Sequence, residues 1–491
     1  MQDLAFLHRS TVPIVIQGLA RSLVDHRPLV TREPTITQGQ LGPIVSRRFR
    51  VLLATAETHP THRADVRVLF GKFLPRCGID CDLIAASLRI PDVVPPWGGG
   101  RLITVRVRSR IGLILADLAH QFSLFWRCFR GYDALIVRDK PFLGLIGLAA
   151  ARFARIPFVY WMSFPMPDAY IEISRNSDGS ASLTRRIYAA IRGRIGAWSL
   201  YSLIAQCADY LFVQSPVMLD ELRERGLSHS RAMPVPMGVD VEALSASARL
   251  QNRQSKAERN LRSAVYLGTL NRLRRAELEL MVDAAKIVGQ CYPDFVLLVI
   301  GESEAEEEKG WLSRYAEACG ATPWVRFTGW LPYDQGIQLA SECAIGLSPF
   351  PRGPLFDSAS PTKVIEYLAV GLPAVCNDQP DQERVVRESG AGLCVDLTAE
   401  SFASAISQLL DSPEDARAMG RIGRSWVSEH RDYRRLAETV ANALRGLCPG
   451  REDDGSRASP SEPRRSVDSL ASCDAPRSSR DHLRTGTSGQ L

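Results

Sequence analysis

Short apolar runs alternate with amphipathic stretches along most of the chain. Runs that are too short for helices, bounded by turn-forming residues, predict buried strands, and apolar positions that recur every three or four residues predict helices. An alternation of the two predicts parallel sheets with helices on both faces. The predicted strands of the first half are Val51–Ala54, Asp82–Ala86, Leu102–Val107, Ala134–Val137, Phe158–Trp161 and Leu211–Val213. Those of the second half are Ala264–Leu267, Phe295–Ile300, Val325–Phe327, Ile345–Ser348, Ala374–Cys376 and Leu393–Val395.

Helical patterns fill the intervals between these strands. The helices predicted in the first half are Asp65–Pro75, Ile111–Cys128, Phe142–Phe153, Leu183–Ala208 and Pro216–Arg225. In the second half, Pro413–Leu447 is long enough to cross back over the first. A short helix with both ends marked is predicted between a Ser360 N-cap, followed by Pro361, and Gly371.

The two series of strands and helices predict two lobes. A chain of 491 residues can bury two cores, so we expect the α/β class, with two doubly wound, Rossmann-like lobes facing across a cleft. The expected N-terminal lobe is 49–245 and the C-terminal lobe 262–430, with a linker at 246–261 and a returning helix at 431–448. Residues 1–48 and 449–491 have polar composition or no sustained period and are expected to be poorly ordered.

Composition narrows the class of protein. Hydrophobic residues make up 45% and charged residues 23%, and no window has the eighteen or so uninterrupted apolar residues of a membrane span. The N-terminus carries Asp3 and has no clear cleavage site, so we expect a cytoplasmic protein without a signal peptide. Eleven cysteines occur without paired CxxC spacing, which favours reduced thiols and predicts no metal site.

Positive charge is concentrated in the N-terminal lobe. The net charge is +6, but residues 101–204 alone contain fifteen Lys or Arg against six Asp or Glu. Two basic amphipathic stretches lie there, at 106–130 and 183–203. Each is typical either of a helix on an anionic membrane surface or of a helix that packs on a sheet and turns a basic face to water. The sequence leaves both interpretations open.

Two candidate anion sites follow strands of the C-terminal lobe. Gly268 and the arginines Arg272, Arg274 and Arg275 follow the first strand, and guanidinium groups match phosphate oxygens. The start of the short helix offers free N–H groups beside Lys363, and Glu366 lies on the same helix face. In a parallel sheet both sites open at one edge, which suits a diphosphate with a sugar hydroxyl on Glu366. A solvated helix start and a surface Lys–Glu pair are the alternatives.

Further along the chain, several motifs resemble a known family. The motifs are Gly268–Arg275, Val299–Glu302, Val325–Pro332, Gly346–Phe350 and Ser360–Val375, in this order, with Val235–Asp240 similar to a hinge motif. Together they resemble the group 1 retaining glycosyltransferases, family four of the GT-B fold. The resemblance is strong in the C-terminal lobe and weak in the N-terminal one. The loop after the first strand, 55–63, has no GxGxxG, which argues against a dehydrogenase.

The resemblance implies a nucleoside-diphosphate-sugar donor in the C-terminal lobe, an acceptor held mainly in the N-terminal lobe, retention at the anomeric carbon, and no metal or other cofactor. Arg272 and Arg274 would bind the diphosphate, together with the backbone at Thr362 and Lys363. Glu366 would bind the ribose hydroxyls, and Trp330 or its neighbours would border the base. The full set of expected donor-binding residues is Gly268, Thr269, Arg272, Arg274, Glu302, Trp330, Ser358, Pro361, Thr362, Lys363 and Glu366.

One position departs from the family pattern. Ser358 stands where the family usually has a glutamate that contacts the donor sugar. The neighbouring Asp357 either substitutes for it or caps a loop. In the N-terminal lobe, His59, His62 and Arg63 follow the first strand, and we expect one of them to contact a sugar; a solvated loop histidine is the alternative. These three residues and Asp357 are the catalytic candidates, and no nucleophile is identified.

The predicted function is sugar transfer from a nucleotide sugar to a glycan or polyprenyl-linked acceptor in surface or exopolysaccharide synthesis. The predicted location is the cytoplasm, on the inner membrane face, with an anionic membrane surface as partner through the N-terminal lobe and no nucleic acid. A GT-B epimerase or phosphorylase is one alternative. A catalytically silent nucleotide-sugar-binding subunit, suggested by Ser358, is another.

Overall fold

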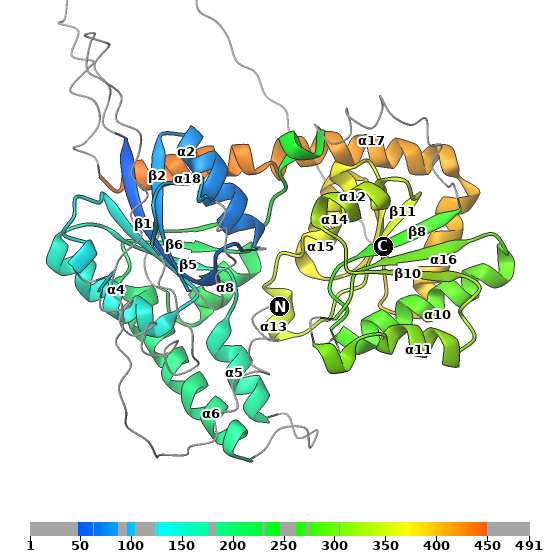
Figure 1. Ribbon diagram of the computed structural model, residues 1–491, viewed down its shortest axis with the longest axis horizontal. Helices are drawn as coiled ribbons and strands as arrows, with labels where there is room; N and C mark the ends of the chain where they lie inside the picture. The colour runs from blue at the N-terminus through cyan, green and yellow to red at the C-terminus, as the bar shows by residue number, and fades with distance from the viewer. Residues whose placement is uncertain are drawn as a thin grey trace, which may run out of the picture. The chain divides into compact units, whose positions relative to one another are not determined.

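The computed structural model describes residues 48–448 except 62, 87–95, 104–122, 125, 176–182, 228–230, 246–261, 272–273 and 304. Within these residues the chain forms two parallel-sheet α/β lobes (Figure 1). The two terminal segments, the linker 246–261 and most of the basic stretch 106–130 lie outside the described residues, as do His62 and Arg272.

Lobe one contains a seven-stranded parallel sheet in the order β3-β2-β1-β4-β5-β6-β7. Its strands are β1 (Phe49–Thr58), β2 (Ile79–Ala86), β3 (Leu102–Ile103), β4 (Ala134–Arg138), β5 (Phe158–Met162), β6 (Tyr210–Val213) and β7 (Ala232–Pro234). Its helices are the π-helix η1 (Asp65–Phe73), α2 (Leu74–Arg76), α4 (Pro141–Ala154), α5 (Met166–Arg175), α6 (Leu183–Ala197), the π-helix η2 (Trp198–Ile204), α7 (Ala205–Cys207) and α8 (Pro216–Glu224).

The central strands of this sheet are buried on both faces, whereas β3 and β7 at its two edges are half-buried. On β1, Leu52 and Ala54 pack into one apolar cluster, and Val51 and Leu53 pack into the cluster on the opposite face. The alternation follows from the two-residue period of a strand. Strands that are apolar on both faces are typical of parallel sheets covered by helices on each side.

Lobe two contains a six-stranded parallel sheet in the order β10-β9-β8-β11-β12-β13. Its strands are β8 (Ser263–Leu267), β9 (Val296–Ile300), β10 (Val325–Gly329), β11 (Ile345–Ser348), β12 (Ala374–Asn377) and β13 (Gly392–Val395). The other elements are α10 (Arg275–Cys291), the 3-10 turn η4 (Glu306–Glu308), α11 (Trp311–Ala318), α12 (Tyr333–Ser341), α13 (Pro354–Asp357), α14 (Lys363–Ala369), α15 (Pro380–Ser389), α16 (Ala399–Asp411), α17 (Pro413–His430) and α18 (Tyr433–Gly446).

The stretch predicted as one helix over Pro413–Leu447 is two helices, which corrects that prediction. The break at Arg431–Asp432 has a tertiary cause, because Arg431 O accepts a hydrogen bond from Val239 N (2.9 Å) and Tyr433 N donates to Val239 O (3.0 Å). After the break, α18 packs into the core of lobe one through Tyr433, Ala437 and Leu444. Two further elements, β7 and α5, were not predicted.

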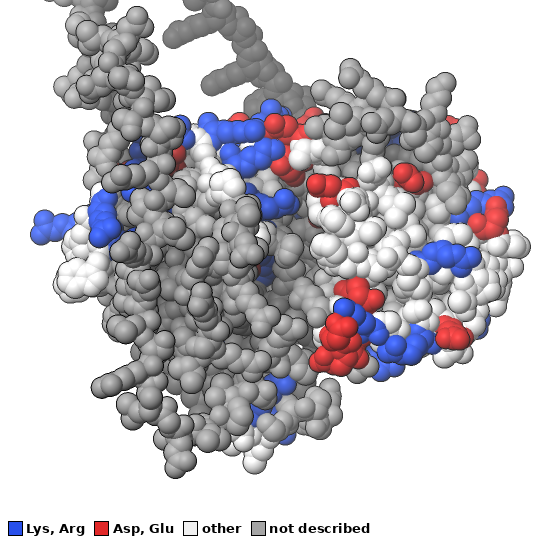
Figure 2. Space-filling view, viewed as in Figure 1, with Lys and Arg blue, Asp and Glu red and all other residues white. Residues whose placement is uncertain are grey.

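Charge is mixed over much of lobe two. On the face shown in Figure 2, basic and acidic side chains are interspersed among uncharged ones over the described part of this lobe. Among the residues that the structure describes, no helix combines the length and apolar character needed to cross a bilayer.

Candidate functional site

The strand order of lobe two reverses direction between β8 and β11, which are neighbours in the sheet. In open parallel sheets, ligands bind outside the carboxyl ends of the strands at such a switch point. The loop after β8 begins at Gly268, and the loop after β11 begins at Pro349. Most of the predicted donor-binding residues follow β8 or lie between β11 and the end of α14.

Three loops approach one another closely at this edge. A Cβ atom on Gly301, after β9, would lie 2.0 Å from Gly268 O. A Cβ atom on Gly268 would in turn lie 2.8 Å from Nζ of Lys363, at the start of α14. Glycine is therefore required at both positions for this approach. The predicted glycine loop and the predicted lysine come together, although 95 residues separate them in the sequence.

Lys363 is half-buried beside an aromatic ring. Its Nζ lies 5.3 Å from the centroid of the Tyr266 ring, within the range of a cation–π contact. Burial lowers the pKa of Lys363, and the charge of Arg274 acts in the same direction, whereas Tyr266 and Glu366 oppose the shift. A cation whose positive charge is incompletely compensated is suited to an anionic ligand.

Glu366 lies one turn further along α14. Its Oε1 accepts a hydrogen bond from the hydroxyl of Tyr333, the first residue of α12, at 3.4 Å. Burial raises the pKa of Glu366, and Lys363 partly offsets that rise. Trp330, after β10, is 68% exposed. Its indole is available for contact with a base, and its role stays a prediction.

Arg274 is buried and occupied by protein contacts. Its guanidinium donates hydrogen bonds to the Tyr266 hydroxyl and to Pro349 O, and lies 4.8 Å from the centroid of the Phe350 ring. Arg274 therefore joins the loop after β8 to the loop after β11. A direct contact of this residue with a diphosphate stays a prediction.

Ser360 does not cap α14, which corrects the prediction from sequence. The helix begins at Lys363, and its N-cap is Thr362, whose side chain makes no capping hydrogen bond. Ser360 Oγ instead donates to Asp381 Oδ2 (2.6 Å) and accepts from Met237 N (3.0 Å). Pro361, between Ser360 and Thr362 in the sequence, is buried. Gly371 has φ 78°, as predicted for a residue just beyond the helix end.

The loop that replaces the family's glutamate is packed within the protein. Ser358 is fully buried, and its carbonyl oxygen accepts a hydrogen bond from Ser215 Oγ at 2.7 Å. Asp357 pairs with Arg352, with 2.8 Å between Nε and Oδ1, and accepts from Gly353 N. These contacts favour the loop-capping interpretation of Asp357. A donor-sugar contact from either residue stays a prediction.

Two other predicted residues lie close to this edge. Thr269 follows Gly268 and is half-buried. Glu302 Oε1 accepts from Ser303 N (2.9 Å) and from Gly310 N (3.4 Å), so this carboxylate holds its own loop.

A second charged cluster lies at the switch point of lobe one, where β1 and β4 are neighbours. Arg138, at the end of β4, is 1% exposed and forms ion pairs with Asp65 (2.9 Å), Glu57 (3.2 Å) and Asp139 (3.0 Å). Burial raises the pKa of Asp139, an effect that the charge of Arg138 opposes. Ser163 N donates to Asp139 Oδ1 at 2.7 Å.

Of the catalytic candidates of lobe one, Arg63 lies beside this cluster, His59 contacts Trp97, and His62 lies outside the described residues. Arg63 Nε lies 3.3 Å from Glu57 Oε1, so Arg63 is connected to Arg138 through a shared carboxylate. The ring of His59 lies edge-on to Trp97, with 6.0 Å between ring centroids. The roles of His59, His62 and Arg63 stay predictions.

Tyr266 and Tyr333 are two site residues that the sequence analysis did not select. Tyr266 is the penultimate residue of β8, and it was read only as part of an apolar strand. A tyrosine near the carboxyl end of a strand next to the switch point is a usable signal, since its hydroxyl can reach the loops above the sheet.

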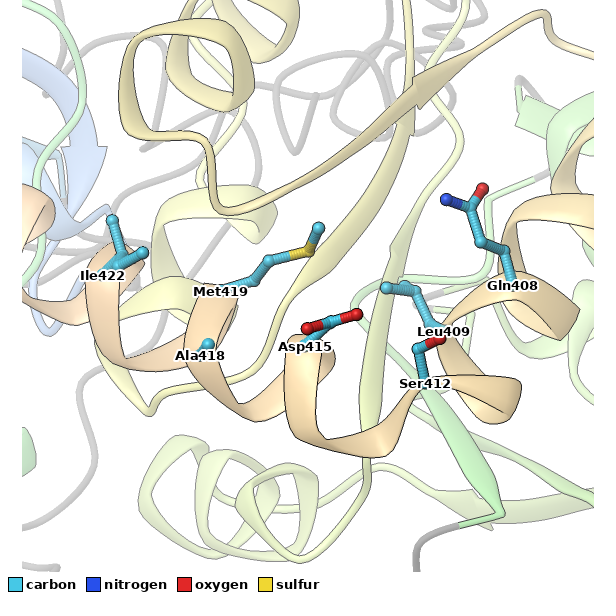
Figure 3. A pocket seen from close by; sticks show the side chains of 7 residues that line it. All are labelled: Gln408, Leu409, Ser412, Asp415, Ala418, Met419 and Ile422. Carbon is cyan, nitrogen blue, oxygen red and sulfur yellow. The ribbon is translucent and has the colours of Figure 1, made fainter.

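A pocket of about 270 Å³ lies elsewhere in lobe two, between α16 and α17. Figure 3 shows its lining side chains on these two consecutive helices and at Ser412 between them. They are Gln408, Leu409, Ser412, Asp415, Ala418, Met419 and Ile422. None of them is a predicted site residue.

Comparison with known families agrees with this geometry. Residues 46–238 match the model of the glycosyl transferase 4-like domain, and residues 250–426 match that of the glycosyl transferases group 1. The chain belongs to the group 1 glycosyltransferases. Among solved GT-B structures, the chain is similar to sucrose-phosphate synthase from Thermosynechococcus elongatus. The TM-score is 0.58 at 19% sequence identity, and the match covers 82% of this chain and 99% of the synthase. Anabaena HepE in complex with UDP and glucose gives a TM-score of 0.57 at 14% identity, covering 81% of this chain and 100% of HepE.

Two mycobacterial relatives of this group 1 glycosyltransferase act on phosphatidylinositol derivatives. The phosphatidyl-myo-inositol mannosyltransferase of Mycobacterium tuberculosis is 28% identical over 37% of this chain, and the chain spans about half (46%) of that relative's length. The GDP-mannose-dependent alpha-(1-6)-phosphatidylinositol monomannoside mannosyltransferase of the same species is 27% identical over 73% of this chain and 98% of its own length.

Proposed function

We propose that this protein is a retaining, metal-independent glycosyltransferase that moves a sugar from a nucleoside-diphosphate-sugar to a lipid-linked or glycan acceptor. The observation that carries the proposal is the convergence of Gly268, Lys363 and Glu366 at the switch point of lobe two. The relatives that use GDP-mannose and act on phosphatidylinositol derivatives support a nucleotide-sugar donor and a lipid-linked acceptor.

The residues at this edge suit the binding of a nucleoside diphosphate. The ammonium of Lys363 and the amides of the close glycine loop would face the phosphate oxygens, and the Glu366 carboxylate would accept hydrogen bonds from the ribose hydroxyls. Cleavage of the sugar–phosphate bond leaves negative charge on the diphosphate. A fixed cation in a partly buried site stabilises that charge, which is the task a divalent ion performs in other transferases.

The acceptor would bind in lobe one, beside the buried cluster around Arg138. Carboxylates and arginines offer acceptors and donors for sugar hydroxyls. We propose that transfer takes place at the inner face of the membrane, in surface or exopolysaccharide synthesis. The excess of positive charge in residues 101–204 and the lipid-linked acceptors of the relatives support this location.

Donor titration of a Lys363→Met variant tests the site. Methionine keeps most of the side-chain volume and removes the charge, so the affinity for UDP or GDP should fall at least about tenfold, which is about 1.4 kcal/mol. Lys309→Met is the matched control, because Lys309 pairs with Glu306 on the surface of the same lobe. Equal nucleotide affinity in the parent and the Lys363→Met variant would contradict the assignment.

A second measurement separates transfer from the alternatives. A transferase releases nucleoside diphosphate from its donor only when an acceptor is supplied, here a membrane lipid extract. An epimerase converts the nucleotide sugar without an acceptor, and a phosphorylase cleaves an oligosaccharide with phosphate. Ser358, which stands where the family usually has a glutamate, motivates the silent-subunit alternative. For such a subunit, nucleotide binds without turnover under either condition.

A further inference from the structure

Helix α6 carries a stripe of large apolar side chains that the fold leaves uncovered. Leu183, Ile187, Ile191 and Ile195 follow one another at intervals of four residues, and Trp198 continues the series at the start of η2. Residues at this spacing share one face of a helix. Each of the five side chains is between 47% and 71% exposed.

The opposite face of α6 explains why the stripe points outward. Helices α5 and α6 lie side by side in Figure 1, and the buried residues of α6 are the small ones, Ala189, Gly193 and Gly196. A Cβ atom on Gly193 would lie 2.8 Å from Ile171 Cγ1 and 3.0 Å from Pro167 O. The close packing of the two helices excludes larger side chains from this face, so the bulky apolar residues lie on the solvent side.

This arrangement is the reverse of that of an ordinary surface helix, which buries its large apolar residues and exposes its polar ones. A contiguous exposed apolar surface marks a site of interaction with another molecule or a membrane. The partner of α6 must therefore have an apolar region that can cover about four turns of this helix.

The charges of the same segment identify that partner. Residues 183–204 include Arg185, Arg186, Arg192 and Arg194 and contain no Asp or Glu. The guanidinium of Arg192 lies over the ring of Tyr170, 4.7 Å from its centroid, and donates to the Tyr188 hydroxyl at 2.6 Å. Apolar residues flanked by arginines fit an anionic lipid surface, where phosphates meet the guanidinium groups and acyl chains meet the apolar stripe. A second copy of the same helix would bring four positive charges against four.

We propose that the exposed face of α6 inserts its Leu183, Ile187, Ile191, Ile195 and Trp198 side chains into the interface of an anionic membrane. Helix α5 begins three residues after Ser163, which holds Asp139 of the lobe-one cluster. The inserted surface is therefore connected through α5 to the side of lobe one where the acceptor is proposed to bind. That link to a lipid-linked acceptor rests on the proposed function, whereas the membrane contact itself does not.

Flotation of the full chain with vesicles tests the inference. We expect the protein to float with phosphatidylcholine vesicles that contain phosphatidylglycerol and to remain unbound with phosphatidylcholine alone. Ile191→Ser should lower the affinity for the anionic vesicles at least about tenfold, equivalent to about 1.4 kcal/mol. Ile422→Ser is the matched control, because Ile191 and Ile422 are each 54% exposed and Ile422 lies on α17.

Two further variants test the contact between α6 and the membrane. Arg194→Glu should weaken binding to anionic vesicles, and the intrinsic fluorescence change on vesicle addition should be smaller in Trp198→Phe. Flotation that Ile191→Ser leaves unchanged would overturn the proposal. The proposal would also be overturned if the main effect of Ile191→Ser were to dissociate a dimer, or if the parent protein did not bind anionic vesicles. Nucleotide titration of the same variants separates the two proposals, since Ile191→Ser should bind UDP or GDP like the parent.

Discussion

Among individual residues, Gly268 controls the position of the proposed phosphate-binding lysine. A Cβ atom at this position would meet Cε and Nζ of Lys363 at 2.8 Å each. Because these atoms are the tip of a flexible side chain, Gly268→Ala should fold but displace the ammonium group. We expect the affinity for nucleoside diphosphate to fall by a factor of about ten. Thermal stability should fall as well, because the φ of 155° at Gly268 strains any residue other than glycine. Gly446→Ala, where a new Cβ meets nothing within 4 Å, is the control for calorimetric titration.

The proposed role of Glu366 in ribose binding predicts that donor binding depends on pH. Burial raises the pKa of this carboxyl above its ordinary value. In the proposed role the ionised carboxylate accepts hydrogen bonds from the ribose hydroxyls. Acidification should therefore protonate Glu366 and weaken nucleotide binding at a higher pH than for an exposed glutamate. Titrations at a series of pH values should show this acidic limb. The limb should vanish in Glu366→Gln, and a limb of the same size in that variant would contradict the role of Glu366.

At the scale of elements, a buried polar network joins the start of α14, α15 and the α17–α18 turn. The guanidinium of Arg431 donates to Asp381 Oδ1 (2.6 Å), to Ser360 Oγ (3.3 Å) and to Met237 O (3.2 Å). The side chains of Arg431 and Asp381 are 5% and 3% exposed. The Arg431–Asp381 pair thus fixes the segment before α14 relative to Met237, in the hinge-like motif Val235–Asp240.

Asp381→Asn should be strongly destabilising, because it leaves the buried Arg431 charge without its counterion. The expected loss is about 3 kcal/mol of unfolding free energy, measured by urea denaturation. Glu388→Gln is the control on the same helix, since Glu388 forms an exposed pair with Arg384 at 3.6 Å. That change should stay within about 0.5 kcal/mol. Equal effects of the two substitutions would show that the network contributes no more than a surface ion pair.

The elements that the sequence predicted are those with strong local patterns. Apolar runs such as Ala134–Val137 and Ala374–Cys376 coincide with strands, because a strand buried on both faces needs apolar residues at every position. Helix α5 was missed because its first turn contains Pro167 and Asp168, which also favour a turn. Strand β7 was missed since it is only three residues long and ends in a proline.

For the site, sequence reasoning identified residues but not their contacts. Gly268, Lys363 and Glu366 could be selected because each has a local signal: a glycine after a strand, or a charge at the start of a helix. The burial of Arg274 could not be predicted, since Tyr266 and Phe350 surround it from two different strand ends. The role of Ser360 was misjudged for the same reason, because Asp381 and Met237 compete with the helix for its hydroxyl.

At the scale of the whole molecule, the chain leaves lobe one, builds lobe two and returns. Its last helix, α18, completes the core of lobe one with five buried side chains, Tyr433, Ala437, Val440, Ala441 and Leu444. Lobe one therefore depends on residues that follow lobe two in the sequence. A substitution in α18 should destabilise the lobe that lies further away along the chain.

The pair Leu444→Ala and Leu409→Ala tests this dependence. Both leucines are buried, Leu444 in the core of lobe one and Leu409, on α16, in that of lobe two. Each substitution leaves a cavity that costs about 2–5 kcal/mol. In limited proteolysis followed by mass spectrometry, Leu444→Ala should expose cleavage sites within 48–240, and Leu409→Ala should expose sites within 262–430. If Leu444→Ala instead exposed cleavage sites in lobe two, the prediction would be wrong. Helix α18 would then stabilise lobe two, its neighbour in sequence, rather than lobe one, whose core it contacts.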